Sequence, residues 1–316
     1  MTEPLPDEQG RPRLGASGRV LVRAPAKINL HLGVGPLRRD GYHELTTVYH
    51  AISLYDDVAA RRGDQLTLTM EGEGTGQLPL DGTNLVLRAA QMLAGHTGVA
   101  AHARLHLRKA IPVAGGLAGG SADAAATLVA CDALWGTGLG RDDLAKLAAT
   151  LGSDVPFLVL GGTALGTGRG ETVSPVLARA NSWHWVVATA DGGLSTPQVY
   201  RELDRLRAAG TAPAPLGPPD GLLAALRQRD PEVLADCLGN DLAVAALSLW
   251  PALRDTLDAG TDAGAVAGLV CGSGPSCVFL ARGESHARTL AAALAGSGTC
   301  RDAVAAYGPV PGARVL

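Results

Sequence analysis

Residues 111–123 combine the residue types that bind phosphate groups. This stretch reads IPVAGGLAGGSAD, with four glycines between positions 115 and 120, and an alanine-rich run that favours a helix follows as far as Trp135. Glycines allow the backbone to fold so that several N–H groups point at one spot, and a helix N-terminus adds unpaired N–H groups with partial positive charge. Ser121 or Asp123 is expected to cap the first turn of the helix. The stretch therefore predicts a phosphate cradle, and the alternative is a glycine turn that only joins a strand to a helix.

Two common phosphate motifs do not fit this stretch. The glycines are not followed by Gly-Lys-Ser or Gly-Lys-Thr, and their spacing is not G-x-G-x-x-G. A Walker A loop and a dinucleotide-binding fold are therefore disfavoured.

Polar side chains also share one face of a predicted strand at residues 19–35. Alternation along this strand places Ile28, Leu30 and Leu32 on one face and Lys27, Asn29 and His31 on the other. The pattern predicts a lysine and an asparagine side by side in a site, although an exposed strand face would show the same periodicity.

Two further positions carry groups that could act on a substrate. Asp154 comes just before Val155-Pro156, a position typical of a helix start, so it is either a capping residue or a functional carboxylate. Tyr42 and His43 follow the turn signal Asp40-Gly41, and taken alone this pair predicts only ordinary surface.

Composition limits the classes of protein. The chain has 316 residues, 47% hydrophobic and 18% charged, which is enough for two domains with a large core. The net charge of −3 gives no general attraction to nucleic acid or to an anionic membrane, and no apolar run is long enough to span a bilayer. The five cysteines form no C-x-x-C pair, so a reducing, cytoplasmic setting is expected.

The predicted elements around these residues form two α+β groups. In the first, strands are predicted at residues 64–70 and 102–108 and helices at 84–93, 121–135 and 141–151. From residue 184 onward, extra helices aside, the order is strand, helix, two strands, helix and strand, a ferredoxin-like split β-α-β arrangement. We therefore expect a disordered tail at residues 1–18, without the apolar segment of a signal peptide, and two domains at residues 19–178 and 179–316.

Three stretches taken together resemble the GHMP kinases, a family named for galactokinase, homoserine kinase, mevalonate kinase and phosphomevalonate kinase. Residues 112–122 resemble the family's phosphate loop, residues 24–30 (APAKINL) its first motif and residues 271–276 (CGSGPS) its third. Residues 39–45 (RDGYHEL) and 153–157 (SDVPF) are similar to the branch that phosphorylates a CDP-linked methylerythritol. The chain departs from the family at Ala114, Ala118 and Ala122, where Gly or Ser is common, but an alanine keeps its backbone N–H.

The resemblance implies a fold and a role for each matching residue. The fold would be the two-domain GHMP kinase fold, with an N-terminal domain like ribosomal protein S5 domain 2 and a ferredoxin-like C-terminal domain. Asp154 would be the catalytic base and Lys27 its cationic partner. ATP would be held by Asn84 and by the loop residues Pro112, Val113, Ala114, Gly115, Gly116, Leu117, Ala118, Gly119, Gly120, Ser121 and Ala122. The substrate would be held by Asn29, Tyr42, His43, Tyr200, Gly272, Ser273 and Gly274, with Tyr42, His43 and Tyr200 around the cytosine.

The expected chemistry is phosphoryl transfer from ATP to the 2-hydroxyl of the CDP-linked methylerythritol, in the non-mevalonate route to isoprenoid precursors. This reaction needs an aligned hydroxyl, neutralised phosphate charge and a proton acceptor. Lys27 would favour the ionised form of Asp154 and stabilise charge on the transferred group. Mg²⁺ would enter with ATP, on ligands that the sequence does not specify. The expected partners are thus ATP and a small-molecule substrate, with no nucleic acid and no membrane, and the oligomeric state is left open.

Two alternatives stay open at this point. Another GHMP kinase, of the mevalonate or homoserine type, is disfavoured by Tyr42 and His43, since those substrates carry no cytosine. A catalytically silent ligand-binding relative is disfavoured because Lys27 and Asp154 are both present.

Overall fold

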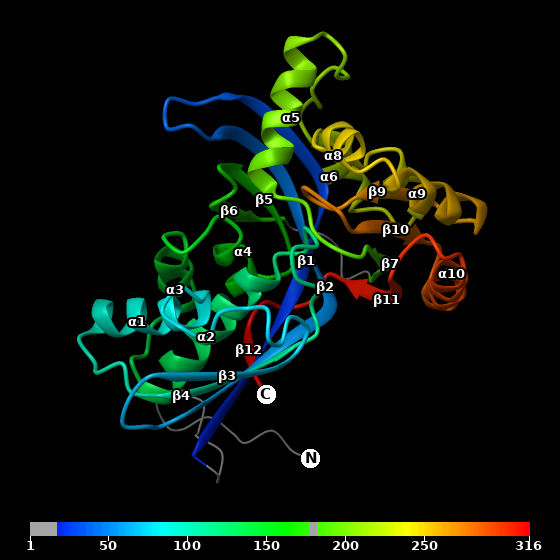
Figure 1. Ribbon diagram of the computed structural model, residues 1–316. Helices are drawn as coiled ribbons and strands as arrows, with labels where there is room; N and C mark the ends of the chain where they lie inside the picture. The colour runs from blue at the N-terminus through cyan, green and yellow to red at the C-terminus, as the bar shows by residue number, and fades with distance from the viewer. Residues whose placement is uncertain (1–17, 177–181) are drawn as a thin grey trace.

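The computed structural model describes residues 18–176 and 182–316. The predicted tail lies outside the described residues except for Gly18, and so does the predicted domain boundary at residues 178–179. Within the described ranges the strands form two sheets, and helices pack against both (Figure 1).

The first sheet is built mostly from the N-terminal half of the chain. Its central strands follow the order β12-β1-β2-β4-β3, while β5 pairs with β2 and β6, and β8 pairs with β1. These strands are β1 (Arg19–Leu37), β2 (His43–Arg61), β3 (Thr67–Gly72), β4 (Arg104–Lys109), β5 (Thr163–Gly168), β6 (Thr172–Pro175), β8 (Gly239–Asn240) and β12 (Arg314–Val315).

The second sheet belongs to the C-terminal half. It is antiparallel and follows the order β11-β7-β10-β9, with β7 (Trp183–Thr189), β9 (Ala267–Val270), β10 (Cys277–Ala281) and β11 (Asp302–Gly308). Together with α5 (Thr196–Ala208) and α10 (Glu284–Gly296), these strands run β-α-β-β-α-β along the chain. The predicted ferredoxin-like arrangement is therefore confirmed. Between α5 and β9 lie α6 (Asp220–Ala225), α7 (Pro231–Ala235), α8 (Ala243–Leu249) and α9 (Leu253–Asp262).

A long hairpin of β1 and β2 connects the two halves. Residues 24–34 of β1 are all buried, so the expected polar face with Lys27 and Asn29 faces the interior rather than solvent. The sequence marks only a loop or strand start at Tyr42 and His43, whereas the structure forms a strand of 19 residues, β2, from His43 to Arg61. In Figure 1 the tip of this hairpin extends from the body of the molecule and lies beside α5. β2 thus carries residues from the first sheet to the C-terminal half.

Four helices cover the first sheet: α1 (Leu85–Thr97), α2 (Gly119–Trp135), α3 (Arg141–Ala148) and α4 (Val155–Leu160). α2 packs against β1, β2, α1 and α4, and residues 122–128 within it are all buried. A helix that is apolar on nearly all sides belongs in a core, and its small alanines allow close approach of its neighbours. α2 begins at Gly119, two residues before the predicted start, so the last glycines of the loop form its first turn.

The two central strands of the C-terminal sheet, β7 and β10, are buried on both faces. Alternate residues of β7 divide between two cores, since Trp185 and Val187 pack with the N-terminal half whereas Val186 and Ala188 pack with residues of α5, α8 and α10. The chain end then returns to the first sheet, where Val315 of β12 pairs with Val22 of β1. Within residues 18–176 and 182–316, no helix combines the length and apolar character that crossing a membrane requires.

Candidate active site

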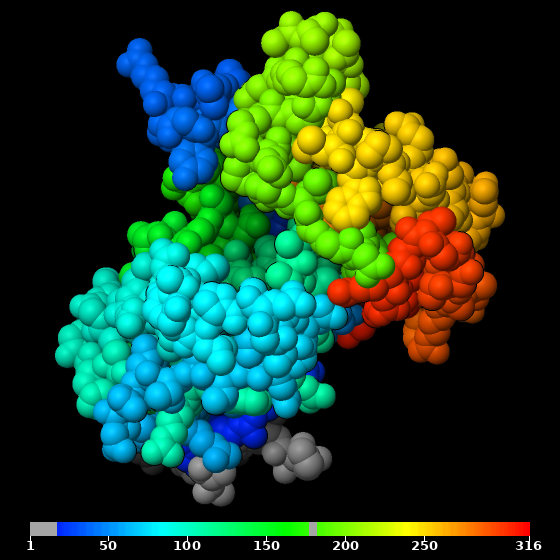
Figure 2. All heavy atoms as spheres, viewed as in Figure 1, coloured from blue at the N-terminus to red at the C-terminus, as the bar shows by residue number. Residues whose placement is uncertain are grey.

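A cavity of about 810 Å³ lies where the two halves meet. Its wall combines residues of β1, the tip of the β1–β2 hairpin, the glycine loop before α2, the start of α4, α5 and the turn between β9 and β10. The space-filling view shows the molecule hollowed between the N-terminal and C-terminal halves (Figure 2). The motifs singled out in the sequence therefore meet around one space, which is large enough for a nucleotide-sized ligand.

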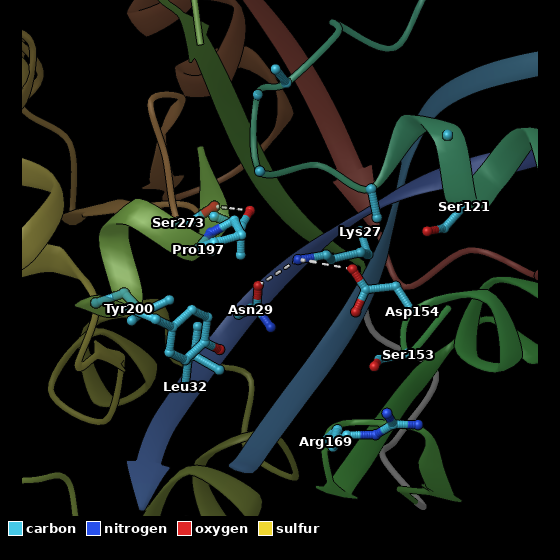
Figure 3. Close-up of a pocket in the computed structure, with 18 of the residues that line it drawn as sticks. Lys27, Asn29, Leu32, Ser121, Ser153, Asp154, Arg169, Pro197, Tyr200 and Ser273 are labelled. Carbon is cyan, nitrogen blue, oxygen red and sulfur yellow. Dashed lines mark hydrogen bonds and ion pairs between the residues drawn. The ribbon is translucent and has the colours of Figure 1, made fainter. Parts of the chain in front are cut away.

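Lys27, Asn29 and Asp154 lie at the centre of this cavity (Figure 3). The ammonium of Lys27 donates a hydrogen bond to Oδ1 of Asn29 at 2.8 Å and lies 3.8 Å from Oδ2 of Asp154. The Asn29 amide in turn donates to the hydroxyl of Thr47 at 2.8 Å. Because Lys27 and Asn29 are buried and hydrogen-bonded to each other, the lysine ammonium is held beside the carboxylate.

Asp154 occupies the N-cap position of α4, but its side chain makes no capping hydrogen bond. Its Oδ1 instead accepts a hydrogen bond from the hydroxyl of Tyr49 at 3.0 Å. The carboxylate is turned into the cavity rather than onto its own helix, so the alternative of a simple helix cap does not describe it.

The glycine loop folds as a tight, left-handed turn before α2. Ala114 and Ala118 both adopt positive φ, at 55° and 59°, and Gly116 does so at 76°. A Cβ at Gly116 would lie 2.1 Å from the carbonyl oxygen of Cys271, so glycine is required there by contact with the C-terminal half. The loop also accepts a hydrogen bond at the Leu117 carbonyl from the N–H of Lys27. Its shape is thus set by neighbours on both sides.

The expected caps of α2 are wrong. Ala118 occupies the N-cap position without a side-chain hydrogen bond, while Ser121 lines the cavity. Asp123 points inward, where Lys109 donates to its Oδ2 at 2.8 Å and to Oδ2 of Asp56 at 2.6 Å. Asp56 also accepts from the backbone N–H groups of Ala110 and Ile111. The unpaired N–H groups of the first turn are therefore left for a ligand.

This buried cluster carries two carboxylates and one ammonium. Burial raises the pKa of Asp123 well above its usual range, against the opposing effect of the Lys109 charge. Burial alone would lower the pKa of Lys109, but the charges of Asp123 and Asp56 raise it. The cluster lies against the glycine loop, because Nζ of Lys109 is 3.0 Å from where a Cβ of Gly119 would be.

The aromatic groups at the far end of the cavity lie on the hairpin tip and on α5. Tyr200 stacks on the ring of His43, with centroids 5.2 Å apart, and Tyr42 lies beneath the guanidinium of Arg169 at 4.8 Å. Nε2 of His43 lies 2.9 Å from Oδ1 of Asp204 on α5. The hairpin tip and α5 are joined by this contact, and the role of the two tyrosines on one base stays a prediction.

The turn between β9 and β10 closes the cavity from the C-terminal side. Gly272 lies against the hydrogen-bonded side chains of Lys27 and Asn29. A Cβ at Gly272 would be 3.4 Å from both Nζ of Lys27 and Oδ1 of Asn29. The hydroxyl of Ser273 forms a hydrogen bond of 2.9 Å with that of Thr196 at the start of α5. The third motif (residues 271–276) therefore contacts the first motif (residues 24–30) through Gly272.

Family models for the GHMP kinases match both halves of the chain. The N-terminal domain of the GHMP kinases matches residues 84–162, and the C-terminal domain matches residues 222–300. The chain is also 72% identical over 315 residues to the Salinispora tropica protein named 4-diphosphocytidyl-2-C-methyl-D-erythritol kinase, with full coverage of both chains. The chain belongs to the GHMP kinases. The Mycobacterium tuberculosis protein of the same name is 56% identical over 300 residues, covering 95% of this chain and 94% of that one.

Solved structures of GHMP kinases have the same fold. The structure of a 4-(cytidine 5'-diphospho)-2C-methyl-D-erythritol kinase superimposes with a TM-score of 0.75 at 35% identity, covering 91% of this chain and 98% of that one. A homoserine kinase from Cytophaga hutchinsonii superimposes with a TM-score of 0.71 at 19% identity, covering 96% of this chain and 98% of that one, which shows a shared fold only. The two-domain GHMP kinase fold implied by the sequence is confirmed.

Most of the residues expected to form the GHMP kinase site line the cavity, and four do not. Leu117 and Ala122 are buried behind the loop, and Gly274 packs near Val270. Asn84 caps α1, where its Oδ1 accepts from the N–H of Val86 and its amide donates to the carbonyl of Pro79. The cavity wall contains the others: Lys27, Asn29, Tyr42, His43, Pro112, Val113, Ala114, Gly115, Gly116, Ala118, Gly119, Gly120, Ser121, Asp154, Tyr200, Gly272 and Ser273.

Several residues of the cavity wall are not indicated by the sequence patterns. Tyr49 and Lys109 lie in the wall from strands whose local patterns did not mark them, and Arg169, Arg201 and Asp204 lie there from loops and α5. Arg169 lies within the glycine-rich segment 166–170, which could have drawn attention to it. Arg169 and Arg201 add positive charge to the cavity wall.

Proposed function

We infer that this chain is a kinase that transfers the γ-phosphoryl group of ATP to the 2-hydroxyl of 4-diphosphocytidyl-2-C-methyl-D-erythritol, in the methylerythritol phosphate route to isoprenoid precursors. The observation that carries this inference is the 72% identity, over the whole of both chains, to the Salinispora tropica kinase of that name. The site supports it, because Lys27 and Asp154 face each other in a cavity bounded by a phosphate-binding loop.

In this reaction Asp154 accepts the proton of the substrate hydroxyl as the oxygen attacks the γ-phosphorus. The new O–P bond forms, the bond to the β-phosphate oxygen breaks, and ADP leaves. Lys27 stabilises the negative charge that spreads over the transferred group, and its hydrogen bond to Asn29 keeps it aimed at that position. Asn29 therefore serves the reaction by holding Lys27.

The phosphates of ATP would lie against the glycine loop and the first turn of α2. Residues 119–121 form the first turn of α2, where backbone N–H groups have no partner within the helix, and all three line the cavity. We propose that the loop residues that line the cavity hold these phosphates, and that the turn at Gly272 and Ser273 holds the substrate diphosphate. Asn84 would support the adenosine end indirectly by fixing the start of α1.

Mg²⁺ fits this site only as an ion that arrives with the nucleotide. Within the described ranges no three His, Cys, Asp or Glu side chains are grouped closely enough to hold a metal. Mg²⁺ commonly takes most of its ligands from phosphates and water, with one or two protein oxygens. We propose that the hydroxyl of Ser121, in the cavity wall, supplies one of those oxygens. The ion would neutralise part of the phosphate charge.

The cytosine would be recognised at the end of the cavity formed by the hairpin tip and α5. Tyr200 offers a ring face, which every base can use, so stacking there does not distinguish cytosine from uracil. We propose that His43 reads the edge of the base by hydrogen bonds, since a mismatch would leave buried polar groups unpaired. We also propose a cytoplasmic location, where the five free cysteines would stay reduced.

A turnover assay tests this function directly. The purified protein is mixed with MgATP and, separately, with the CDP-linked methylerythritol, its UDP-linked analogue, mevalonate or homoserine, and ADP release is followed. We expect turnover with the CDP-linked compound, much lower kcat/KM with the UDP form, and a smaller gap between the two in His43→Ala. Preferred turnover of mevalonate or homoserine would favour another GHMP kinase, and binding without any turnover would favour a silent relative.

A further inference from the structure

Tyr49 of β2 touches both members of the catalytic pair. Its hydroxyl donates to Oδ1 of Asp154 at 3.0 Å, and the ammonium of Lys27 lies 5.9 Å from the centre of its ring. The other side of the ring stacks on Phe157 of α4, with centroids 4.9 Å apart. Tyr49 therefore bridges from the core of the first sheet to the reacting end of the cavity.

The space around Tyr49 is shaped by two glycines of the segment that follows Asp154. A Cβ at Gly166 would lie 2.6 Å from Cε2 of the ring, and a Cβ at Gly170 would lie 2.2 Å from the hydroxyl oxygen. Gly170 also has a φ of +99°, a conformation that other residues rarely adopt. The absence of side chains at Gly166 and Gly170 thus leaves room for the tyrosine ring and its hydroxyl, which points toward Asp154.

The two carboxylate oxygens of Asp154 have different partners. Oδ1 is occupied by the Tyr49 hydroxyl, whereas Oδ2 lies beside Lys27 and faces the cavity. Burial, together with the charge of Asp154, raises the pKa of the Tyr49 phenol well above its usual range, so the phenol stays protonated and donates. Oδ2 is therefore the oxygen left to take a proton.

We propose that Tyr49 is a positioning residue for phosphoryl transfer, which fixes the Asp154 carboxylate so that Oδ2 receives the proton of the substrate hydroxyl. The proposal rests on the function inferred above. During the reaction the proton moves from the substrate oxygen to Oδ2, the substrate oxygen bonds to the γ-phosphorus, and ADP departs with the electrons of the broken O–P bond. Tyr49 keeps its own proton throughout and forms no bond to substrate.

The test removes only the hydroxyl, with Tyr49→Phe. The ring, its stacking on Phe157 and its contact with Lys27 are kept, so the core should stay folded. We expect kcat with the CDP-linked substrate to fall about 10- to 100-fold, as for a lost hydrogen bond to a charged group, while KM for ATP stays within about twofold. In an Asp154→Asn background, measured with radiolabelled ATP, the same change should have no further effect, because its partner carboxylate is already gone.

Tyr55→Phe provides a matched control. Tyr55 lies on the same strand but packs near Arg23 and Arg314, and it is not part of the cavity wall. It should leave kcat unchanged. If Tyr49→Phe keeps kcat within about twofold of the wild type, or lowers it equally in both backgrounds, Tyr49 serves only the core and the proposal is wrong. A wild-type protein that does not turn over the CDP-linked substrate would instead refute the proposed function, and this inference with it.

Discussion

Replacing Lys109 with methionine removes the cation of the buried cluster that it forms with Asp56 and Asp123 beside the glycine loop. Its ammonium lies 2.6 Å and 2.8 Å from the carboxylates of Asp56 and Asp123, and all three side chains are at most 5% exposed. Methionine has a similar length and no charge, so Lys109→Met leaves two carboxylates facing each other out of water. Breaking a buried ion pair on one side typically costs about 3–5 kcal/mol. We expect about 3 kcal/mol, the lower end, because Asp123 can take up a proton.

Urea unfolding of both proteins at pH 7.5 measures this loss as a lower midpoint with an unchanged slope. The loss should shrink at pH 5.5, because burial already raises the pKa of Asp123 and removal of Lys109 withdraws the charge that opposes this. Lys146→Met is the control, since Lys146 pairs with Asp143 on an exposed helix surface and should hardly change stability. A loss below about 1 kcal/mol at both pH values would refute the argument, because it would mean that water reaches the carboxylates.

Two further predictions concern the same fold. Burial lowers the pKa of His50 to about 3, so the folded state holds it neutral while the unfolded chain protonates it near pH 6.5. The contribution of His50 to the unfolding free energy is therefore complete above pH 6.5 and is lost as pH falls toward 3. Over this range, the difference in unfolding free energy between wild type and His50→Gln should change by up to about 1.4 kcal/mol per pH unit. Parallel pH curves would contradict this. Ala118→Gly should raise stability by about 0.5–1 kcal/mol in urea unfolding, because it relieves a left-handed alanine at an N-cap, whereas Ala122→Gly inside α2 should lower it. A lower midpoint for Ala118→Gly would show that its methyl group packs usefully.

Local signals in the sequence predicted the motifs well, because each depends on neighbouring residues. The glycine run, the alternation around Lys27 and the placement of Asp154 before a proline are all visible within a few positions. Tyr49 was not predicted, since its importance comes from Asp154, 105 residues away along the chain. Asp123 was assigned as a cap for the same reason: its partner Lys109 lies on the strand before the loop, and only the fold brings the two together.

The sequence places Asn29 beside Lys27, but it does not reveal Thr47, because that contact joins β1 to β2 across the hairpin. Both polar atoms of its amide are engaged inside the site, Oδ1 by Lys27 and Nδ2 by the hydroxyl of Thr47. The Thr47 hydroxyl in turn donates to the carbonyl of His31, so a hydrogen-bonded chain runs from the backbone of β1 to the lysine ammonium. The amide nitrogen carries two N–H groups and donates one of them to Thr47, so the other can still donate to a substrate hydroxyl. Asn29 thus sets the direction of Lys27 while one N–H of its amide stays available, so its expected role toward the substrate stays a prediction.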